Sequence, residues 1–216
     1  MDILCSASCV PVREGDHDFD EEADVTMKIV LDKVCKSFDG RPVINDFSHV
    51  FETGNSYVIE GPSGIGKTTL LRIITGLTPC DSGSVTYDKI AKPRFAPVFQ
   101  ETRLINYLDA VRNVKLAARD LPDERIREEL SRIIPEEELS KKVSELSGGT
   151  ARRVEIVRAI LSPSDVLIMD EPLTGLDDET ADLVSSYISD KIKERIFIAS
   201  SHNKRLCAGA HSLVLQ

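Results

Sequence analysis

The stretch GPSGIGKT at residues 61–68 most constrains the fold, because it fits the phosphate-binding pattern G-x-x-x-x-G-K-[S/T]. It follows the apolar run SYVIE at 56–60, which predicts a buried strand, and it leads into a helical pattern at 67–75. A strand, a glycine-rich turn and a helix in this order are the context that such a loop requires. The sequence therefore predicts an α/β fold built around a nucleotide-phosphate site.

Each residue type in this loop has a physical role. Gly61, Gly64 and Gly66 let the backbone curl so that successive N–H groups face one point. The N-terminus of the following helix adds a dipole that favours an anion. We expect Lys67 to reach the β- and γ-phosphates and the Thr68 hydroxyl to ligate Mg²⁺. The predicted nucleotide contacts also include Pro62, Ser63, Ile65 and Thr69.

A second buried strand, in VLIMDEP at 166–172, ends in two acidic residues. Asp170 follows the apolar run at the carboxyl end of the strand, where ligands bind to open α/β sheets. An aspartate at this point can hold Mg²⁺ through water. Glu171 comes next and is expected to act as a general base on an attacking water.

Two further polar residues end predicted strands at the same rim. Gln100 closes APVFQ at 96–100, and its amide can contact both the metal shell and a water. His202, in SSHN after the last clear strand, can contact the γ-phosphate. Taken alone, a strand-end glutamine is more often solvated and a strand-end histidine more often structural. Their place beside a phosphate-binding loop favours the functional interpretation for both.

Strand and helix patterns alternate along most of the chain. The charged stretch 101–145, broken by Pro122 and Pro135, predicts a helical insert, and with the following helix it makes a helical subdomain at about 101–160. Alternation of this kind predicts a mainly parallel, covered sheet with an antiparallel N-terminal edge. Further strands are expected at 28–34, 48–53, 83–88, 165–170 and 195–200, and a further helix at about 178–193.

Composition limits the function classes. The chain has 216 residues, a net charge of −9 and no apolar run near the roughly 20 residues that span a bilayer. The negative charge argues against nucleic acid or anionic lipid as the main partner. Five cysteines without a CxxC spacing favour reduced thiols in a cytosolic protein. Residues 1–26 include an acidic run and are expected to be a disordered tail, with one domain at 27–216; Met27 is an alternative start.

The most specific stretch is LSGGT at 146–150, where a serine and two glycines open an amphipathic helix. In chain order, GPSGIGKTT, Gln100, LSGGT, VLIMDEP, LTGLD at 173–177 and His202 together resemble the ATP-binding cassette (ABC) family of ATPases. The resemblance covers about residues 28–216. It implies a P-loop fold of the ABC type, with ATP and Mg²⁺ as cofactors.

The resemblance also explains the serine and glycines. In this family two cassettes pair head to tail around two nucleotides, and the signature of one faces the γ-phosphate held by the other. This implies that Ser147, Gly148 and Gly149 form an anion-binding helix N-terminus for the partner's ATP. Asp177 is expected near the same seam, and Phe38 where the family places an adenine-stacking aromatic.

Some positions depart from the family pattern. Thr150 stands where the signature usually has glutamine, and it keeps a hydrogen-bonding group but loses reach. Phe38 replaces a more usual tyrosine, which preserves stacking. The stretch between Tyr87 and Phe95 is short, so we expect a trimmed edge hairpin. None of these departures removes a phosphate-contacting residue.

The stretch FQETRLINYLDAVRNV at 99–114 is most similar to importers of the nitrate, sulfonate and taurine group. This implies transmembrane permease partners, pairing as a homodimer or with a sister cassette, and a cytoplasmic place on the inner face of the membrane through the permease only. Two other functions stay open: a soluble cassette in repair or translation, and a regulator of a membrane complex that does not pump. Cargo is chosen by other subunits.

Overall fold

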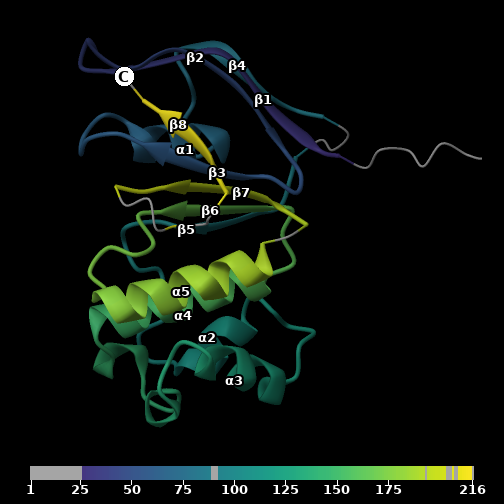
Figure 1. Ribbon diagram of the computed structural model, residues 1–216, viewed down its shortest axis with the longest axis vertical. Coiled ribbons are helices and arrows are strands. Elements are labelled where there is room, and N and C mark those ends of the chain that lie inside the picture. Colours follow the sequence, from purple (N-terminus) through teal and green to yellow (C-terminus); the bar gives the residue numbers. More distant parts are fainter. Residues whose placement is uncertain (1–25, 89–91, 193, 203–205, 207–208, 216) are drawn as a thin grey trace, which may run out of the picture.

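The computed structural model describes residues 26–88, 92–192, 194–202, 206 and 209–215. The predicted tail therefore lies, apart from Thr26, outside the described residues, as does part of the short connection after Tyr87. The described chain forms two sheets with helices between and below them (Figure 1). This arrangement confirms the predicted α/β architecture with a mainly parallel sheet and an antiparallel N-terminal edge.

The antiparallel sheet has three strands in the order β2-β1-β4. It contains β1 (Lys28–Phe38), β2 (Arg41–Glu52) and β4 (Ser82–Tyr87). Asp39 and Gly40 adopt positive φ angles of 50° and 75°, which makes a tight turn and pairs Phe38 with Arg41. This turn extends β2 well before the predicted start at residue 48, and it extends β1 beyond residue 34.

The parallel sheet has five strands in the order β5-β6-β7-β3-β8. Its strands are β3 (Ser56–Glu60), β5 (Phe95–Val98), β6 (Val166–Asp170), β7 (Ile196–Ser200) and β8 (His211–Val214). The edge strand β8 was not predicted, because its four residues, HSLV, mix polar and apolar side chains, whereas the equally short β5 is a continuous apolar run. Parallel pairing places the carboxyl ends of all five strands at one rim.

The helices are α1 (Lys67–Ile74), α2 (Ala110–Lys115), α3 (Asp123–Ser131), α4 (Gly148–Leu161) and α5 (Asp178–Lys191). Two 3₁₀ turns, η1 (Glu136–Glu138) and η2 (Val143–Glu145), complete the insert. Pro122 and Pro135 directly precede α3 and η1, which fits their inability to continue a helix. The stretch 101–109 contains no helix, so the insert is less helical than predicted.

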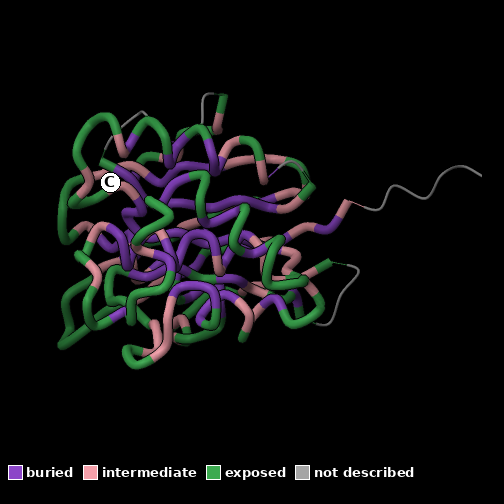
Figure 2. Tube along the Cα trace, turned by 90° about the horizontal axis from the view of Figure 1, so that it is seen from below, coloured by how far each residue is buried: buried purple, intermediate pink, exposed green. Residues whose placement is uncertain are grey.

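Two hydrophobic cores lie on opposite faces of the parallel sheet. Helix α1 lies between the two sheets, where Ile168 and Ile198 join the core of the antiparallel sheet (Figure 1). Their neighbours Leu167 and Phe197 face the core formed with the helices of the other layer. Figure 2 shows the buried segments crossing the middle of the molecule, with exposed loops around them. Among the helices in the described part of the chain, none has the length and apolar character needed to cross a bilayer.

Candidate functional site

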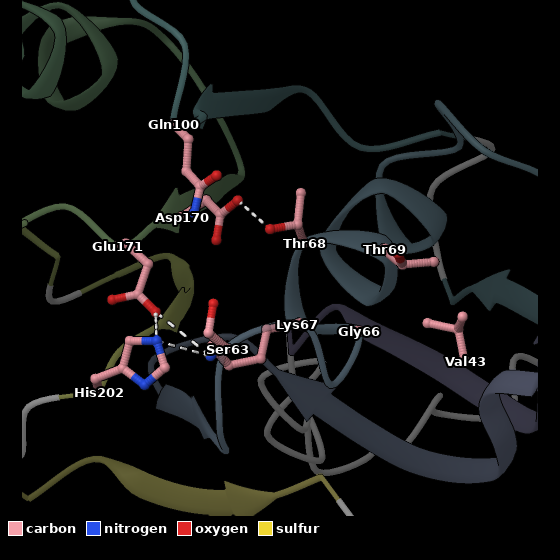
Figure 3. Close-up of a pocket in the computed structure, with 11 residues that line it drawn as sticks. Val43, Ser63, Gly66, Lys67, Thr68, Thr69, Gln100, Asp170, Glu171 and His202 are labelled. Carbon is pink, nitrogen blue, oxygen red and sulfur yellow. Dashed lines mark hydrogen bonds and ion pairs between the residues drawn. The ribbon is translucent and has the colours of Figure 1, made fainter.

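The predicted phosphate site lies at the carboxyl rim of the parallel sheet. A cavity of about 250 Å³ opens between the loop after β3, the end of β6 and the segments that follow β5 and β7 (Figure 3). These elements converge because parallel strands end at the same edge. The cavity is lined by Val43, Ser63, Gly64, Gly66, Lys67, Thr68, Thr69, Gln100, Asp170, Glu171 and His202.

The loop uses its glycines where the backbone demands them. Gly66 precedes α1 with a φ of 115°, and an added Cβ would lie 2.8 Å from Val43 Cγ1. A side chain at this position would therefore be both strained and in collision with β2. Val43 itself was not predicted to line the cavity, because the sequence pattern placed this residue before the strand. Its place in the cavity wall beside Gly66 depends on the long extension of β2.

Lys67 is buried and points back into the loop. Its Nζ donates hydrogen bonds to the carbonyl oxygens of Gly61 at 2.8 Å and Pro62 at 3.2 Å. It also lies 3.5 Å from Glu171 Oε1 and 3.2 Å from His202 Nε2. The loop therefore holds one cation at its centre, in contact with groups from two other strand ends.

Thr68 and Asp170 meet directly across the cavity. The Thr68 hydroxyl donates to Asp170 Oδ2 at 2.6 Å (Figure 3). The other carboxylate oxygen, Oδ1, accepts from the Ser200 hydroxyl at 2.5 Å, and Ser200 is fully buried at the end of β7. Ser200 was not among the predicted residues, because a serine within an otherwise apolar strand gives no sign of its partner across the sheet.

Glu171 has an unusual backbone and an unsatisfied side chain. Its φ is 51°, in the left-handed region that non-glycine residues rarely adopt, and such strain clusters at functional sites. Its N–H donates to the Ser200 hydroxyl at 3.0 Å. Its buried Oε1 lies 3.1 Å from His202 Nε2, yet within the described residues it accepts no hydrogen bond of good geometry. A polar group in the cavity can satisfy this oxygen.

These features fit a nucleotide phosphate with Mg²⁺. Thr68 and Asp170 provide the hard oxygen ligands that Mg²⁺ prefers. The described residues contain no cluster of three or more histidine, cysteine or acidic side chains able to hold a metal. Mg²⁺ tolerates such a sparse site, because it is usually bound through one or two protein groups, waters and substrate phosphates. Gln100 lies beside Asp170 in Figure 3, within the same cavity.

The signature residues lie outside this cavity. Ser147 caps α4 and accepts the Thr150 N–H at 3.1 Å, while Gly148 and Gly149 form its first turn. The two glycines line a second cavity, of about 440 Å³. This second cavity shares two residues with the first, Gln100 and Glu171. That Ser147, Gly148 and Gly149 face a nucleotide held by a partner chain stays a prediction.

The Thr150 side chain is directed toward other residues of its own chain. Its side chain is buried, and its hydroxyl donates to Glu138 Oε2 at 2.8 Å. Thr150 Oγ1 also accepts a hydrogen bond from Arg153 Nη2 at 3.1 Å and lies 2.9 Å from Ser147 Oγ. The hydrogen-bonding group that replaces the usual glutamine therefore braces the signature from within.

The remaining predicted contacts occupy different places. Phe38 ends β1 and is 48% exposed, and Lys36 Nζ lies 5.4 Å from the ring centroid. Ile65 packs on the core around α1, so it supports the loop rather than lining the cavity. Asp177 caps α5, and hydrogen bonds from the Thr180 backbone and hydroxyl lower its pKa. Gly61 and Pro62 contribute carbonyl oxygens to Lys67.

The fold and this loop define a P-loop nucleotide-binding protein. Residues 44–174 match the model of the ABC transporter family, and the chain belongs to that family. The match includes the phosphate loop, the signature and Glu171.

Relatives and solved structures agree with this placement. The chain is 38% identical over 157 residues to the spermidine/putrescine import ATP-binding protein PotA of Fusobacterium nucleatum, covering 67% of this chain and 42% of that protein. It is 36% identical over 162 residues to the protein of that name in Treponema pallidum, covering 69% and 43%. The chain thus spans less than half the length of these curated relatives.

Among solved structures, an ABC transporter ATP-binding protein from Pyrococcus furiosus superposes with a TM-score of 0.77 at 25% identity, covering 87% of this chain and 97% of that one. A dimeric cassette in a post-hydrolysis state, bound to ADP and Pi, has a TM-score of 0.76 at 22% identity and covers 87% and 94%. The second likeness shows the fold alone.

Proposed function

We propose that this chain is the ATP-binding and ATP-hydrolysing subunit of a membrane transporter, in which paired cassettes couple ATP-driven dimerisation and hydrolysis to solute import. One observation carries the proposal: Lys67, Glu171 and His202 meet within 3.5 Å at the phosphate loop, beside the Thr68–Asp170 pair. Lys67 provides a cation for the phosphates, Glu171 provides a general base with His202 beside it, and the Thr68–Asp170 pair provides metal ligands. The proposed domain is 27–216, with its helical subdomain at about 101–160.

The chemistry divides among the residues at the rim. Lys67 binds the β- and γ-phosphates, and Thr68 and Asp170 hold Mg²⁺. When bound, ATP would supply the phosphoryl group, and Mg²⁺ would neutralise negative charge on the phosphates. Glu171 orients a water and accepts its proton, and His202, whose Nε2 lies 3.1 Å from Glu171 Oε1, contacts the γ-phosphate. Gln100, which lies beside Asp170, contacts the metal shell and the water.

Dimerisation completes each site. Ser147, Gly148 and Gly149 of one chain face the γ-phosphate held by the other, and Asp177 lies at the seam. The exposed N-terminus of a 14-residue helix supports this role, because unpaired N–H groups and the helix dipole attract anions. Phe38 is exposed enough to stack on adenine.

The proposed partners are transmembrane permease subunits, which hold the chain on the inner face of the cell membrane. The stretch 99–114 suggests the nitrate, sulfonate and taurine group, whereas the relatives reported above are named as spermidine/putrescine importers. The sequence resemblance and these names point to different cargoes. We therefore propose import without assigning the cargo.

An affinity pull-down from detergent-solubilised membranes tests the proposal. The tagged chain is the bait, the tag alone is the control, and mass spectrometry identifies what co-purifies. We expect a polytopic membrane protein in the eluate. Only soluble partners, together with ATP hydrolysis, would favour a soluble cassette instead. Stimulation of hydrolysis by cargo in the reconstituted complex then distinguishes a transporter from a regulator.

A further inference from the structure

Arg152 joins the signature helix to the segment that carries Gln100. The arginine lies in α4 and is buried. Its Nη1 donates to the Phe99 carbonyl oxygen, and its Nη2 donates to the Gln100 carbonyl oxygen at 2.9 Å. These two consecutive carbonyls follow the end of β5. A planar guanidinium that holds two successive carbonyls fixes both the position and the direction of that backbone.

A buried carboxylate holds the arginine from behind. Glu155, one turn along α4 and 2% exposed, lies 3.5 Å from Arg152 Nη1 and 3.5 Å from Arg158 Nη2. It also accepts a hydrogen bond from the Arg103 N–H. Burial raises the pKa of Glu155, and the Arg103 N–H and the neighbouring arginines oppose that effect. The helix is thus joined to the loop at both ends of 99–103.

Arg158 contacts the same loop at a different point. Its Nη1 donates to the Arg103 carbonyl oxygen at 2.7 Å. No hydrogen bond from Arg158 to Phe99 or Gln100 is found among the described residues. Arg158 therefore provides a matched control for Arg152. Both arginines form an ion pair with Glu155, but only Arg152 donates a hydrogen bond to the Gln100 carbonyl oxygen.

The joined segments lie between the two cavities. Gln100 and Glu171 line both the phosphate cavity and the second cavity at the start of α4. Arg152, Gly148 and Gly149 line only the second. Arg152 therefore connects Gln100, which lines the phosphate cavity, to α4, whose N-terminus carries the signature.

We propose that Arg152 is a positioning residue that ties Gln100 to α4, so that a shift of the signature and a shift of Gln100 are coupled within one chain. Its effect on turnover rests on the proposed function, whereas the tie itself exists without nucleotide. A lysine cannot replace it fully, because one ammonium does not present the two-pronged donor that spans both carbonyls.

Hydrogen exchange of the nucleotide-free chain tests the tie. We expect Arg152→Gln to speed amide exchange in 99–106 by roughly tenfold, because two charge-assisted hydrogen bonds are lost. Arg152→Lys should give an intermediate increase, and Arg158→Gln should leave residues 99 and 100 near the wild-type rate. The proposal would be overturned if Arg152→Gln left exchange at 99–106 unchanged, or if Arg158→Gln raised exchange at residues 99 and 100 as much as Arg152→Gln does.

ATP dependence tests the coupling. In Arg152→Gln we expect the ATP affinity of the monomer to stay within about twofold, kcat to fall roughly tenfold and the Hill coefficient for ATP to fall toward one. Arg152→Lys should recover part of the kcat and part of the Hill coefficient. Equal kcat losses in Arg152→Gln and Arg158→Gln would contradict the coupling. If the wild type hydrolyses no ATP, the proposed function fails, while the exchange experiment still decides the tie.

Discussion

Ser200 donates its hydroxyl proton to Asp170 Oδ1 at 2.5 Å, and the same hydroxyl oxygen accepts the Glu171 N–H at 3.0 Å. One fully buried side chain therefore holds two consecutive acidic residues at the end of β6. The contact leaves Asp170 Oδ2 directed at Thr68. It also supports the left-handed backbone of Glu171.

Replacing Ser200 should weaken Mg²⁺ binding more than nucleotide binding. In Ser200→Ala, Asp170 Oδ1 loses its donor inside the protein, so the carboxylate is free to turn away from Thr68. We expect the Mg²⁺ concentration for half-maximal hydrolysis to rise roughly tenfold. Metal-free ATP binding, measured by calorimetry, should stay unchanged. Ser200→Thr keeps the hydroxyl and should recover part of the Mg²⁺ affinity. An unaltered Mg²⁺ dependence in Ser200→Ala would remove the serine from this role.

Lys67→Ala should abolish tight ATP binding. The ammonium is the cation at the centre of the loop, where it contacts the Gly61 and Pro62 carbonyls. Loss of its charge-assisted bonds to two phosphates should lower ATP affinity roughly 100-fold. Lys28→Ala is the control, because that lysine pairs with Glu52 on the antiparallel sheet. Equilibrium binding of a fluorescent ATP analogue measures the effect, and equal affinities in all three proteins would refute the assignment.

Glu171→Gln should keep ATP binding and stop hydrolysis. The amide preserves the shape of the side chain but cannot accept a proton from water, so we expect a loss of at least about 100-fold in kcat. Because hydrolysis would release the paired cassettes, the variant should accumulate as an ATP-bound dimer. Size-exclusion chromatography with light scattering, with and without ATP, measures this. A monomer under both conditions would contradict the shared-site model for the isolated chain.

Ser147→Arg should spare ATP binding to the monomer and abolish turnover, because the long cation blocks the anion-binding helix N-terminus. The serine is also the N-cap of α4, and losing a cap costs about 1 kcal/mol of stability. Ser147→Asp separates the two effects, since aspartate caps as well as serine but repels a phosphate. We expect Ser147→Asp to melt near the wild type and to lack turnover. Normal hydrolysis in either variant would place Ser147 outside the site.

The sequence predicted the groups at the cavity far better than the groups that hold them. Lys67 was predictable from the phosphate-binding motif. Asp170, Gln100 and His202 were predictable because each ends or follows a strand pattern, and parallel strands bring such ends together. Ser200 and Arg152 were not, because their partners are 30 and 52 or more residues away and only the tertiary fold makes them neighbours. The length of β2 was missed for a related reason, since its polar first half is ordered by pairing with β1.

Helices α3 and α5 are joined at the buried carboxylate of Glu129. Glu129 is 2% exposed and accepts hydrogen bonds from Lys191 at 2.7 Å, Tyr187 at 3.0 Å and Arg125 at 2.6 Å. Glu129→Gln removes the negative charge that these groups surround, so the buried carboxylate no longer pairs with Lys191 and Arg125. We expect it to lower the free energy of unfolding by about 3 kcal/mol at neutral pH. Glu128→Gln is the control, because Glu128 is 65% exposed and pairs only at the surface with Arg125.

The pH dependence of this loss has a definite sign. Burial alone would raise the pKa of Glu129, but hydrogen bonds from Lys191 and Tyr187 and the nearby cations outweigh it, so the pKa in the folded chain lies below its ordinary value of 4.5. The charged carboxylate therefore stabilises the fold fully above that ordinary value, and the stabilisation is lost as the pH falls through the lowered pKa. Urea unfolding at a series of pH values should show that the difference in free energy of unfolding between the wild type and Glu129→Gln becomes smaller below about pH 4.5. A difference that stays constant down to pH values where the wild type unfolds would show that packing, rather than charge, joins the two helices.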